Sequence, residues 1–316
     1  MPSDDWRTTG YGPATPEPAP HGAQAERPAA SDPLTDEPPA AGEDAHGEAP
    51  RHDEPPPRAP ETPTGFLAGW WRDIAQAVTF LTRIPFQIDE ATAARPLAAA
   101  ARGFPVAGLV VGVTGAVALT VADWVGLPQL ASALIGIAAT ALVAGGLHED
   151  GLADTVDGLF GGQGRDEALA IMRDSRIGAY GALALIFTVG LKATALEALE
   201  PGAAAAALIA AEVAGRAALP AVMAWMPPAR ADGLGFDAGR PRREDVLAAL
   251  LLGGVLVLLM LGIVAGIAAL IVAAAAAALI ARAAFARLGG QTGDVLGAVE
   301  QVAATAVLLA AAAVVV

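Results

Sequence analysis

The chain contains no cysteine. That absence excludes disulfide bonds, a thiolate nucleophile and a zinc site built on thiolates, so any bound metal must be held by oxygen atoms or histidine. The N-terminal region also lacks the basic start, apolar stretch and cleavage site of a signal peptide. Basic residues are scarce there, and this acidic character argues against nucleic acid as a partner.

Two unlike regions are combined in one chain. Of its residues 54% are hydrophobic, although the net charge is −14. Residues 1–64 hold 13 acidic and 4 basic residues and most of the prolines, with very few large aliphatic side chains. A segment of this composition buries too little apolar surface to fold, so 1–64 is predicted to be a disordered acidic tail. Residues 65–316 are predicted to form a polytopic membrane domain.

The membrane domain begins with the stretch GFLAGWWRDIAQAVTFLTRIPF. Its apolar residues recur at about helical spacing, and Trp70 and Trp71 are typical of the headgroup level of a bilayer. Pro85 ends the pattern. We therefore expect an amphipathic helix lying on the bilayer surface rather than a span.

Long apolar stretches follow, and their length of roughly 18 to 24 residues is what the hydrocarbon core of a bilayer requires. They predict an all-α integral membrane protein with about seven transmembrane helices. The predicted spans are 104–126, 130–147, 178–198, 203–226, 245–263, 265–285 and 299–316.

Arginine placement orients these spans. Under the seven-span count all the interhelical arginines fall on one side, and the opposite connections, near 127–129, 199–202 and 264, contain no Lys or Arg. The positive-inside rule puts the basic side in the cytoplasm. Nearly every polar cluster then faces the cytoplasm, as in an enzyme with a one-sided active site. The arginines are Arg72, Arg83, Arg95, Arg102, Arg165, Arg173, Arg176, Arg230, Arg240, Arg242, Arg243, Arg282 and Arg287.

The stretch GGLHEDGLADTVDGLFGG at 145–162 gathers charge directly after the second span. In a helix, Asp150, Asp154 and Asp157 at i, i+4 and i+7 share one face. A divalent cation would offset their repulsion, and Mg²⁺ binds to carboxylates, waters and substrate phosphates. The motif thus predicts either a magnesium site or a solvated acidic loop. His148 is a candidate general base or phosphate contact, with a purely structural role as the alternative.

Two further polar stretches are predicted on the same side. In MRDSRIGAYG at 172–181, Arg173 and Arg176 bracket Asp174 and Ser175, and guanidinium groups form bidentate bonds with phosphate oxygens. Acids followed by arginines suggest a polyphosphate substrate, although arginines here also suit headgroup anchors. In RLGGQTGDVLGAVEQ at 287–301 the glycines beside a hydroxyl and a carboxylate suit a loop that cradles a ligand. Its candidate binding residues are Gly290, Thr292 and Asp294.

Three ionisable residues fall within predicted spans. Glu212 and Arg216 are one helical turn apart and can pair, which makes their burial less costly. This pair is interpreted as either functional or a structural bond between helices. Lys192 lies near the far end of its span and is expected to extend its ammonium group toward the interface.

The motifs together resemble one family. FLTRIPF at 80–86, FPVAGLVVG at 104–112, GGLHEDGLADTVDGL, MRDSRIGAYG and GGQTGDVLGA at 289–298 are similar, in that order, to motifs of the cobalamin synthase (adenosylcobinamide-GDP ribazoletransferase) family. The resemblance covers the chain from about Trp70 to the C-terminus. It implies a prokaryotic inner-membrane enzyme that is dependent on Mg²⁺. It also implies that adenosylcobinamide-GDP is joined to α-ribazole or its 5′-phosphate and that GMP is released.

Combined with this resemblance, the residues take hypothetical roles. Asp150, Asp154 and Asp157 would hold Mg²⁺ on the diphosphate, Arg173 and Arg176 would offset developing charge, and a carboxylate or His148 would accept the hydroxyl proton. The predicted catalytic residues are His148, Asp154, Asp157, Arg173 and Arg176, and the predicted substrate contacts are Arg173, Asp174, Ser175, Arg176, Gly290, Thr292 and Asp294.

Two other classes of protein are weighed against an enzyme. A transporter would use Glu212, Arg216 and Lys192 as a relay, but it predicts internal hydropathy repeats, and no clear repeat is present. A scaffold would bind partners through the proline-rich tail. The sequence leaves open whether the chain forms a homo-oligomer in the bilayer.

Overall fold

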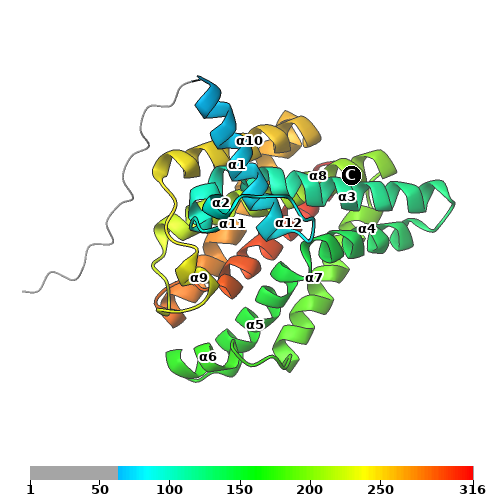
Figure 1. Ribbon diagram of the computed structural model, residues 1–316. Helices are drawn as coiled ribbons and strands as arrows, with labels where there is room; N and C mark the ends of the chain where they lie inside the picture. The colour runs from blue at the N-terminus through cyan, green and yellow to red at the C-terminus, as the bar shows by residue number, and fades with distance from the viewer. Residues whose placement is uncertain (1–62, 316) are drawn as a thin grey trace, which may run out of the picture. The chain divides into compact units, whose positions relative to one another are not determined.

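The computed structural model describes residues 63–315 (Figure 1). Within this range all the regular elements are helices, and β-pairing is limited to an isolated bridge between Pro228 and Gln291. The predicted all-α membrane fold is thereby confirmed. The first helix begins at Pro63 rather than Gly65. The prediction of a disordered tail at 1–64 falls almost wholly outside the described residues.

The helices follow one another with short connections. In chain order they are α1 (Pro63–Leu81), α2 (Glu90–Ala93), the 3₁₀ helix η1 (Leu97–Gly103), α3 (Phe104–Trp124), α4 (Gln129–Ala144), α5 (Leu147–Gly161), α6 (Arg165–Ile171), α7 (Ala179–Glu197), α8 (Pro201–Trp225), α9 (Leu234–Asp237), α10 (Arg243–Leu261), α11 (Ile263–Leu288) and α12 (Gly293–Val315).

Six helical segments within residues 63–315 are long and apolar enough to cross a membrane. They are η1 with α3, then α7, α8, α10, α11 and α12. The second predicted span, 130–147, differs from expectation. Its helix α4 has 16 residues and passes the same test only together with α5, from which it is bent by 91°.

A pair of glycines causes this bend. Gly145 and Gly146 both have positive φ, 71° and 70°, a backbone conformation that ends α4 and that side chains rarely adopt. Because α5 has only 15 residues, fewer than a span requires, we treat it as lying outside the membrane-spanning segments. The acidic motif therefore begins a separate helix with its own direction (Figure 1).

Helices α8 and α12 form the centre of the bundle. In their most apolar stretches 78% and 67% of the residues are buried, against 22% for α10. Small residues allow this close packing. A Cβ atom at Gly108 of α3 would lie 2.5 Å from the carbonyl oxygen of Glu212 on α8, so the two backbones are in direct contact. The outer helices instead present large aliphatic side chains, as lipid-facing surfaces do.

Ion pairs connect helix α1 to η1 and to the segment that precedes η1. The carboxylate of Asp73 is buried and accepts hydrogen bonds from Arg95 (2.7 Å) and Arg102 (2.6 Å), and the Arg102 guanidinium stacks over the ring of Trp70 at 4.7 Å. Helix α1 is not among the six candidate spans. Its placement on the bilayer surface stays a prediction.

Candidate active site

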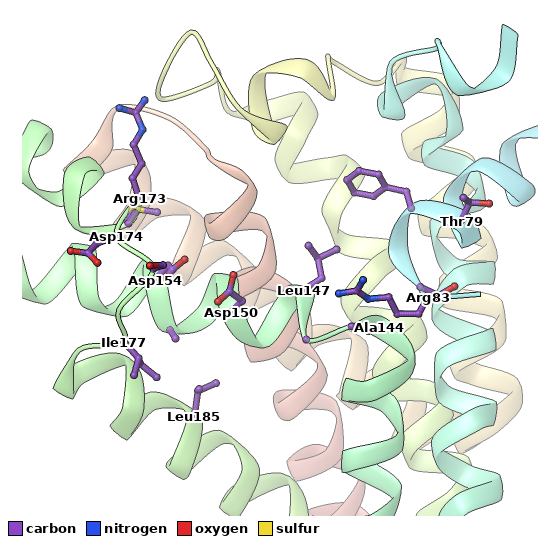
Figure 2. Close-up of a pocket in the computed structure, with 17 residues that line it drawn as sticks. Thr79, Arg83, Ala144, Leu147, Asp150, Asp154, Arg173, Asp174, Ile177 and Leu185 are labelled. Carbon is purple, nitrogen blue, oxygen red and sulfur yellow. The ribbon is translucent and has the colours of Figure 1, made fainter. Parts of the chain in front are cut away.

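A cavity of about 950 Å³ lies between the end of α1, the α4–α5 break, α5 and the segment that leads into α7 (Figure 2). We call it the acidic cavity. Its polar lining includes Asp150, Asp154, Arg173, Asp174 and Ser175, all of which are residues that the sequence predicts for the site. Thr79, Thr82 and Arg83 complete the polar lining from the α1 side. Segments far apart in sequence therefore meet at this cavity.

Helix α5 is held against α12 by glycines. A Cβ atom at Gly151 would lie 2.8 Å from the carbonyl oxygen of Asp294 and 3.1 Å from the Cα of Gly297. Only glycine allows this approach. Because α5 buries its Gly151 side against α12, Asp150 and Asp154 are left on the side that lines the cavity (Figure 2).

The two cavity aspartates are uncompensated. No hydrogen bond or ion pair from another residue in 63–315 reaches the carboxylate of Asp150 or Asp154. Burial raises the pKa of Asp154 to about 7, and the negative charges of Asp150 and Asp294 act in the same direction. A cation in the cavity would relieve this repulsion.

Asp157, the third predicted metal ligand, lies outside the cavity with its carboxylate at the start of α7. Its carboxylate accepts hydrogen bonds from the backbone N–H groups of Gly178 (2.7 Å) and Gly181 (2.9 Å), at the start of α7. A Cβ atom at either glycine would lie 2.3 Å from that carboxylate. Asp157 thus caps α7, where a negative charge also suits the helix dipole, and it does not line the acidic cavity.

The arginine segment before α7 is organised by ion pairs. Arg173 lines the cavity and donates to Asp232 at 2.7 and 2.8 Å, and both side chains are exposed. Arg176 does not line the cavity; it bonds Asp174, and this bond lowers the pKa of Asp174 to about 2. Asp174 therefore stays ionised, and Arg173 is the arginine of the pair that faces the cavity.

Arg83 is a cavity residue that the sequence analysis did not assign to the site. It follows α1, and Figure 2 shows its side chain reaching toward the α4–α5 break. The side chain lies over Gly145, where a Cβ atom would be 2.1 Å from its Nε. Its backbone N–H donates to the carbonyl of Val143 at 2.7 Å. Arg83 belongs to the FLTRIPF motif, which pointed to the family. Nothing in the sequence, however, shows that this motif lies against Gly145 and Gly146.

His148 lies in a buried charge cluster rather than in the cavity. Arg216 forms the centre of this cluster and donates to Glu212 (2.5 Å) and Glu300 (2.6 Å), while His148 Nδ1 lies 3.2 Å from its Nη2. The expected pairing of Glu212 with Arg216 is confirmed. The full cluster is His148, Glu149, Lys192, Glu212, Arg216, Glu300 and Gln301.

The expectation that Lys192 extends to the interface is wrong. The residue is 3% exposed, and its ammonium group donates to Gln301 at 2.8 Å. Gln301 in turn donates to Glu149 (3.0 Å) and to Glu300 (3.0 Å). A polar partner on the neighbouring helix α12 makes burial less costly than extension along the span.

The predicted ligand loop at 287–301 lies close to the site but does not line the cavity. Gly290 packs against the carbonyl of Pro227, where a Cβ atom would be 2.4 Å away, next to a bridge between Pro228 and Gln291. Thr292 accepts a hydrogen bond from the backbone of Val295 at 3.2 Å, at the start of α12. The carboxylate of Asp294 lies 3.8 Å from Arg230. The predicted ligand loop thus packs against residues 227–230, through backbone contacts and through the ion pair between Asp294 and Arg230.

The residues present fit a magnesium ion that arrives with substrate. Among residues 63–315, no three His, Asp or Glu side chains are arranged to hold a metal by themselves. Mg²⁺ in proteins is often bound by only one or two carboxylates together with waters and substrate phosphates. Asp150 and Asp154 provide two such carboxylates, and Arg83 and Arg173 line the same cavity.

Comparison with known proteins confirms the family suggested by the motifs. The cobalamin-5-phosphate synthase family matches residues 73–312. The adenosylcobinamide-GDP ribazoletransferase of Bradyrhizobium diazoefficiens is 45% identical over 242 residues, covering 76% of this chain and 93% of the relative. Its counterpart from Mesorhizobium japonicum is 43% identical over 240 residues, covering 76% and 92%. No solved structure is significantly similar to this chain.

Proposed function

The chain belongs to the cobalamin-5-phosphate synthase family, and on that basis we propose that it is an adenosylcobinamide-GDP ribazoletransferase. It joins adenosylcobinamide-GDP to α-ribazole, or to α-ribazole 5′-phosphate, and releases GMP. The observation that carries the proposal, beside membership of the family, is the acidic cavity, in which two uncompensated carboxylates and two arginines converge. Carboxylates can bind the cation of a metal-bound diphosphate, and arginines can bind its phosphate oxygens.

The reaction is a phosphoryl transfer. The ribazole hydroxyl oxygen attacks the phosphorus nearer to cobinamide and forms a new P–O bond. The P–O bond to the bridging oxygen breaks, and GMP leaves with that oxygen. The hydroxyl proton passes to a carboxylate or to water. Such transfers depend mainly on positioning and on stabilisation of charge, which the residues of the cavity supply.

Each cavity residue has a role in this proposal. Asp150 and Asp154 would hold Mg²⁺ on the diphosphate, and the ion would neutralise charge on the bridging and leaving oxygens. Arg83 and Arg173 would bind phosphate oxygens by bidentate hydrogen bonds.

The protein is a multi-pass membrane protein, and we propose the cytoplasmic membrane of a prokaryote with the acidic cavity facing the cytoplasm. Arg83 and Arg173 lie at the cavity, and Arg165 and Arg287 bind backbone carbonyls of Ala229 and Gly162 nearby. This arginine-rich side is the cytoplasmic one under the positive-inside rule.

A reconstituted assay tests the activity. Purified full-length protein in detergent or vesicles would be incubated with Mg²⁺, adenosylcobinamide-GDP and α-ribazole, and products would be identified by chromatography and mass spectrometry. We expect adenosylcobalamin and GMP in equal amounts, and neither product when chelator replaces Mg²⁺. Folded protein that forms no cobalamin would refute the proposal.

A further inference from the structure

A second cavity, of about 470 Å³, adjoins the acidic cavity across α1. We call it the α1 cavity. Thr79 and Phe80 line both cavities, so these two residues form the boundary between them. The remaining walls come from α1, the segment 88–97 and α9. Its volume falls within the range of about 300–1,000 Å³ that is typical of small-molecule sites.

The lining of the α1 cavity is mostly apolar. Eight of its twelve residues are apolar, namely Phe80, Ile88, Ala93, Ala94, Pro96, Leu97, Leu234 and Ala238. Of the two charged residues, Arg95 is engaged with Asp73 at 2.7 Å and with the carbonyl of Ala99 at 3.0 Å, and Asp237 is exposed. The α1 cavity therefore favours an uncharged ligand with a large apolar surface, in contrast to the acidic cavity.

Two polar atoms of α1 are buried at this cavity without a partner. Gln76 and Thr79 lie one turn apart on the same helix face, and both line the cavity. Among the described residues, neither Gln76 Oε1 nor Thr79 Oγ1 has a hydrogen-bond partner. The Gln76 Nε2 group donates to the carbonyl of Arg95 at 2.9 Å, which leaves the oxygen as the free end. Buried polar atoms of this kind are costly unless a ligand or water satisfies them.

We propose that the α1 cavity binds the benzimidazole nucleoside, α-ribazole, through its apolar ring, with Gln76 and Thr79 as hydrogen-bond partners for its ribose. This inference rests on the proposed function. A dimethylbenzimidazole ring has no exocyclic donor or acceptor, so it suits an apolar wall. A guanine ring carries several polar groups at its edge and would leave them unpaired there. The shared boundary at Thr79 places the nucleoside beside the acidic cavity, where the diphosphate would be bound.

Filling the cavity tests this assignment. Ala94, which directly follows α2, is exposed and lines the α1 cavity, whereas Ala91 within α2 is exposed and does not line it. We expect Ala94→Trp to raise the KM for α-ribazole about tenfold or more, the effect of losing about 1.4 kcal/mol of binding. The KM for adenosylcobinamide-GDP should stay unchanged, and Ala91→Trp should leave both constants unchanged.

Removing one hydroxyl gives an independent test. Thr79→Val keeps the shape of the side chain but loses Oγ1, and we expect it to raise the KM for α-ribazole several-fold, whereas Thr79→Ser should restore it. If Ala94→Trp and Thr79→Val raise only the KM for adenosylcobinamide-GDP, the cavity holds part of that substrate and the inference is wrong. Unchanged constants in both variants would also overturn it. A wild-type protein with no turnover would refute the proposed function, while dialysis of the same variants against α-ribazole would still test the site.

Discussion

The protein contains two groups of charged residues that differ in how their charge is satisfied. In the buried charge cluster, Arg216 is 1% exposed and bonds two carboxylates, Glu212 and Glu300. In the acidic cavity, Asp150 and Asp154 have no such partner within residues 63–315, although the cavity is open to water. In the first group, the central arginine and both of these carboxylates are paired as folded. In the second, an additional positive charge would offset the repulsion between the carboxylates, and a substrate-bound cation would supply it.

This difference distinguishes residues that stabilise the fold from residues that are proposed to act on the substrate. Charges inside a membrane bundle are tolerated when they pair, and breaking such a pair leaves an unpaired buried charge. The cluster joins α5, α7, α8 and α12, so it fixes the helix that carries the cavity aspartates. Substitutions in the cluster should therefore unfold the protein, whereas substitutions in the cavity should remove activity from a folded protein.

The largest effect is expected for Arg216→Met. The variant leaves Glu212 and Glu300 buried without a cation, at a cost of about 3–5 kcal/mol in the free energy of unfolding. Melting of the purified protein in detergent would measure this loss. The triple variant that adds Glu212→Gln and Glu300→Gln removes the unpaired charges and should recover part of the stability. A single variant that melts like the wild type would show that the cluster is not structural.

The next effect is a loss of turnover without a loss of folding. Asp150→Asn keeps the size of the side chain but removes one of the two charges proposed to bind the metal. We expect kcat to fall about 10²- to 10³-fold, as when one group that stabilises developing charge is lost. The melting temperature should not fall. Asp166→Asn on α6, whose side chain is fully open to solvent and outside the cavity, is the matched control. Equal activity in the two variants would contradict the assignment.

A smaller effect distinguishes Asp157 from the cavity aspartates. Asp157→Asn weakens two hydrogen bonds at the start of α7, and we expect it to cost about 1–3 kcal/mol in stability. Gly181→Ala should act similarly, because its Cβ would lie 2.3 Å from the Asp157 carboxylate. Gly190→Ala on the same helix, where no atom lies within 4 Å, is the control. A stable Asp157→Asn protein without turnover would instead return Asp157 to the metal site.

The smallest effect is expected for Arg173→Ala. Its ion pair with Asp232 is exposed and contributes little to stability, so melting should not change. Because Arg173 lines the acidic cavity, we expect a several-fold rise in the KM for adenosylcobinamide-GDP with a smaller change in kcat. Steady-state kinetics at varied substrate measure both constants. A large fall in kcat at constant KM would give Arg173 a role confined to the transition state.

Local patterns predicted much of this structure. Apolar length predicted five spans that the structure bears out as single helices and a sixth that continues from η1. The acidic motif is helical in the structure, which is the condition under which the sequence analysis placed its three aspartates on one face, but only Asp150 and Asp154 line the cavity. The bend before it was missed because an apolar run continues through Gly145 and Gly146, and only their positive φ shows that the chain turns.

Contacts between distant segments could not be predicted. The capping of α7 by Asp157 and the packing of Arg83 on Gly145 depend on how helices meet, which one-dimensional spacing does not contain. Lys192 illustrates the same limit. Its position along the span suggested extension to the interface, whereas a partner on α12, Gln301, determines where it lies.

The central claim is that the acidic cavity performs the transfer, and Asp154→Ala tests it most directly. The measurement is the rate of cobalamin and GMP formation by the variant and the wild type, at equal amounts of folded protein in vesicles with Mg²⁺. We expect the variant to form neither product while its membrane content and melting temperature match those of the wild type. Near-normal turnover by Asp154→Ala would contradict the account.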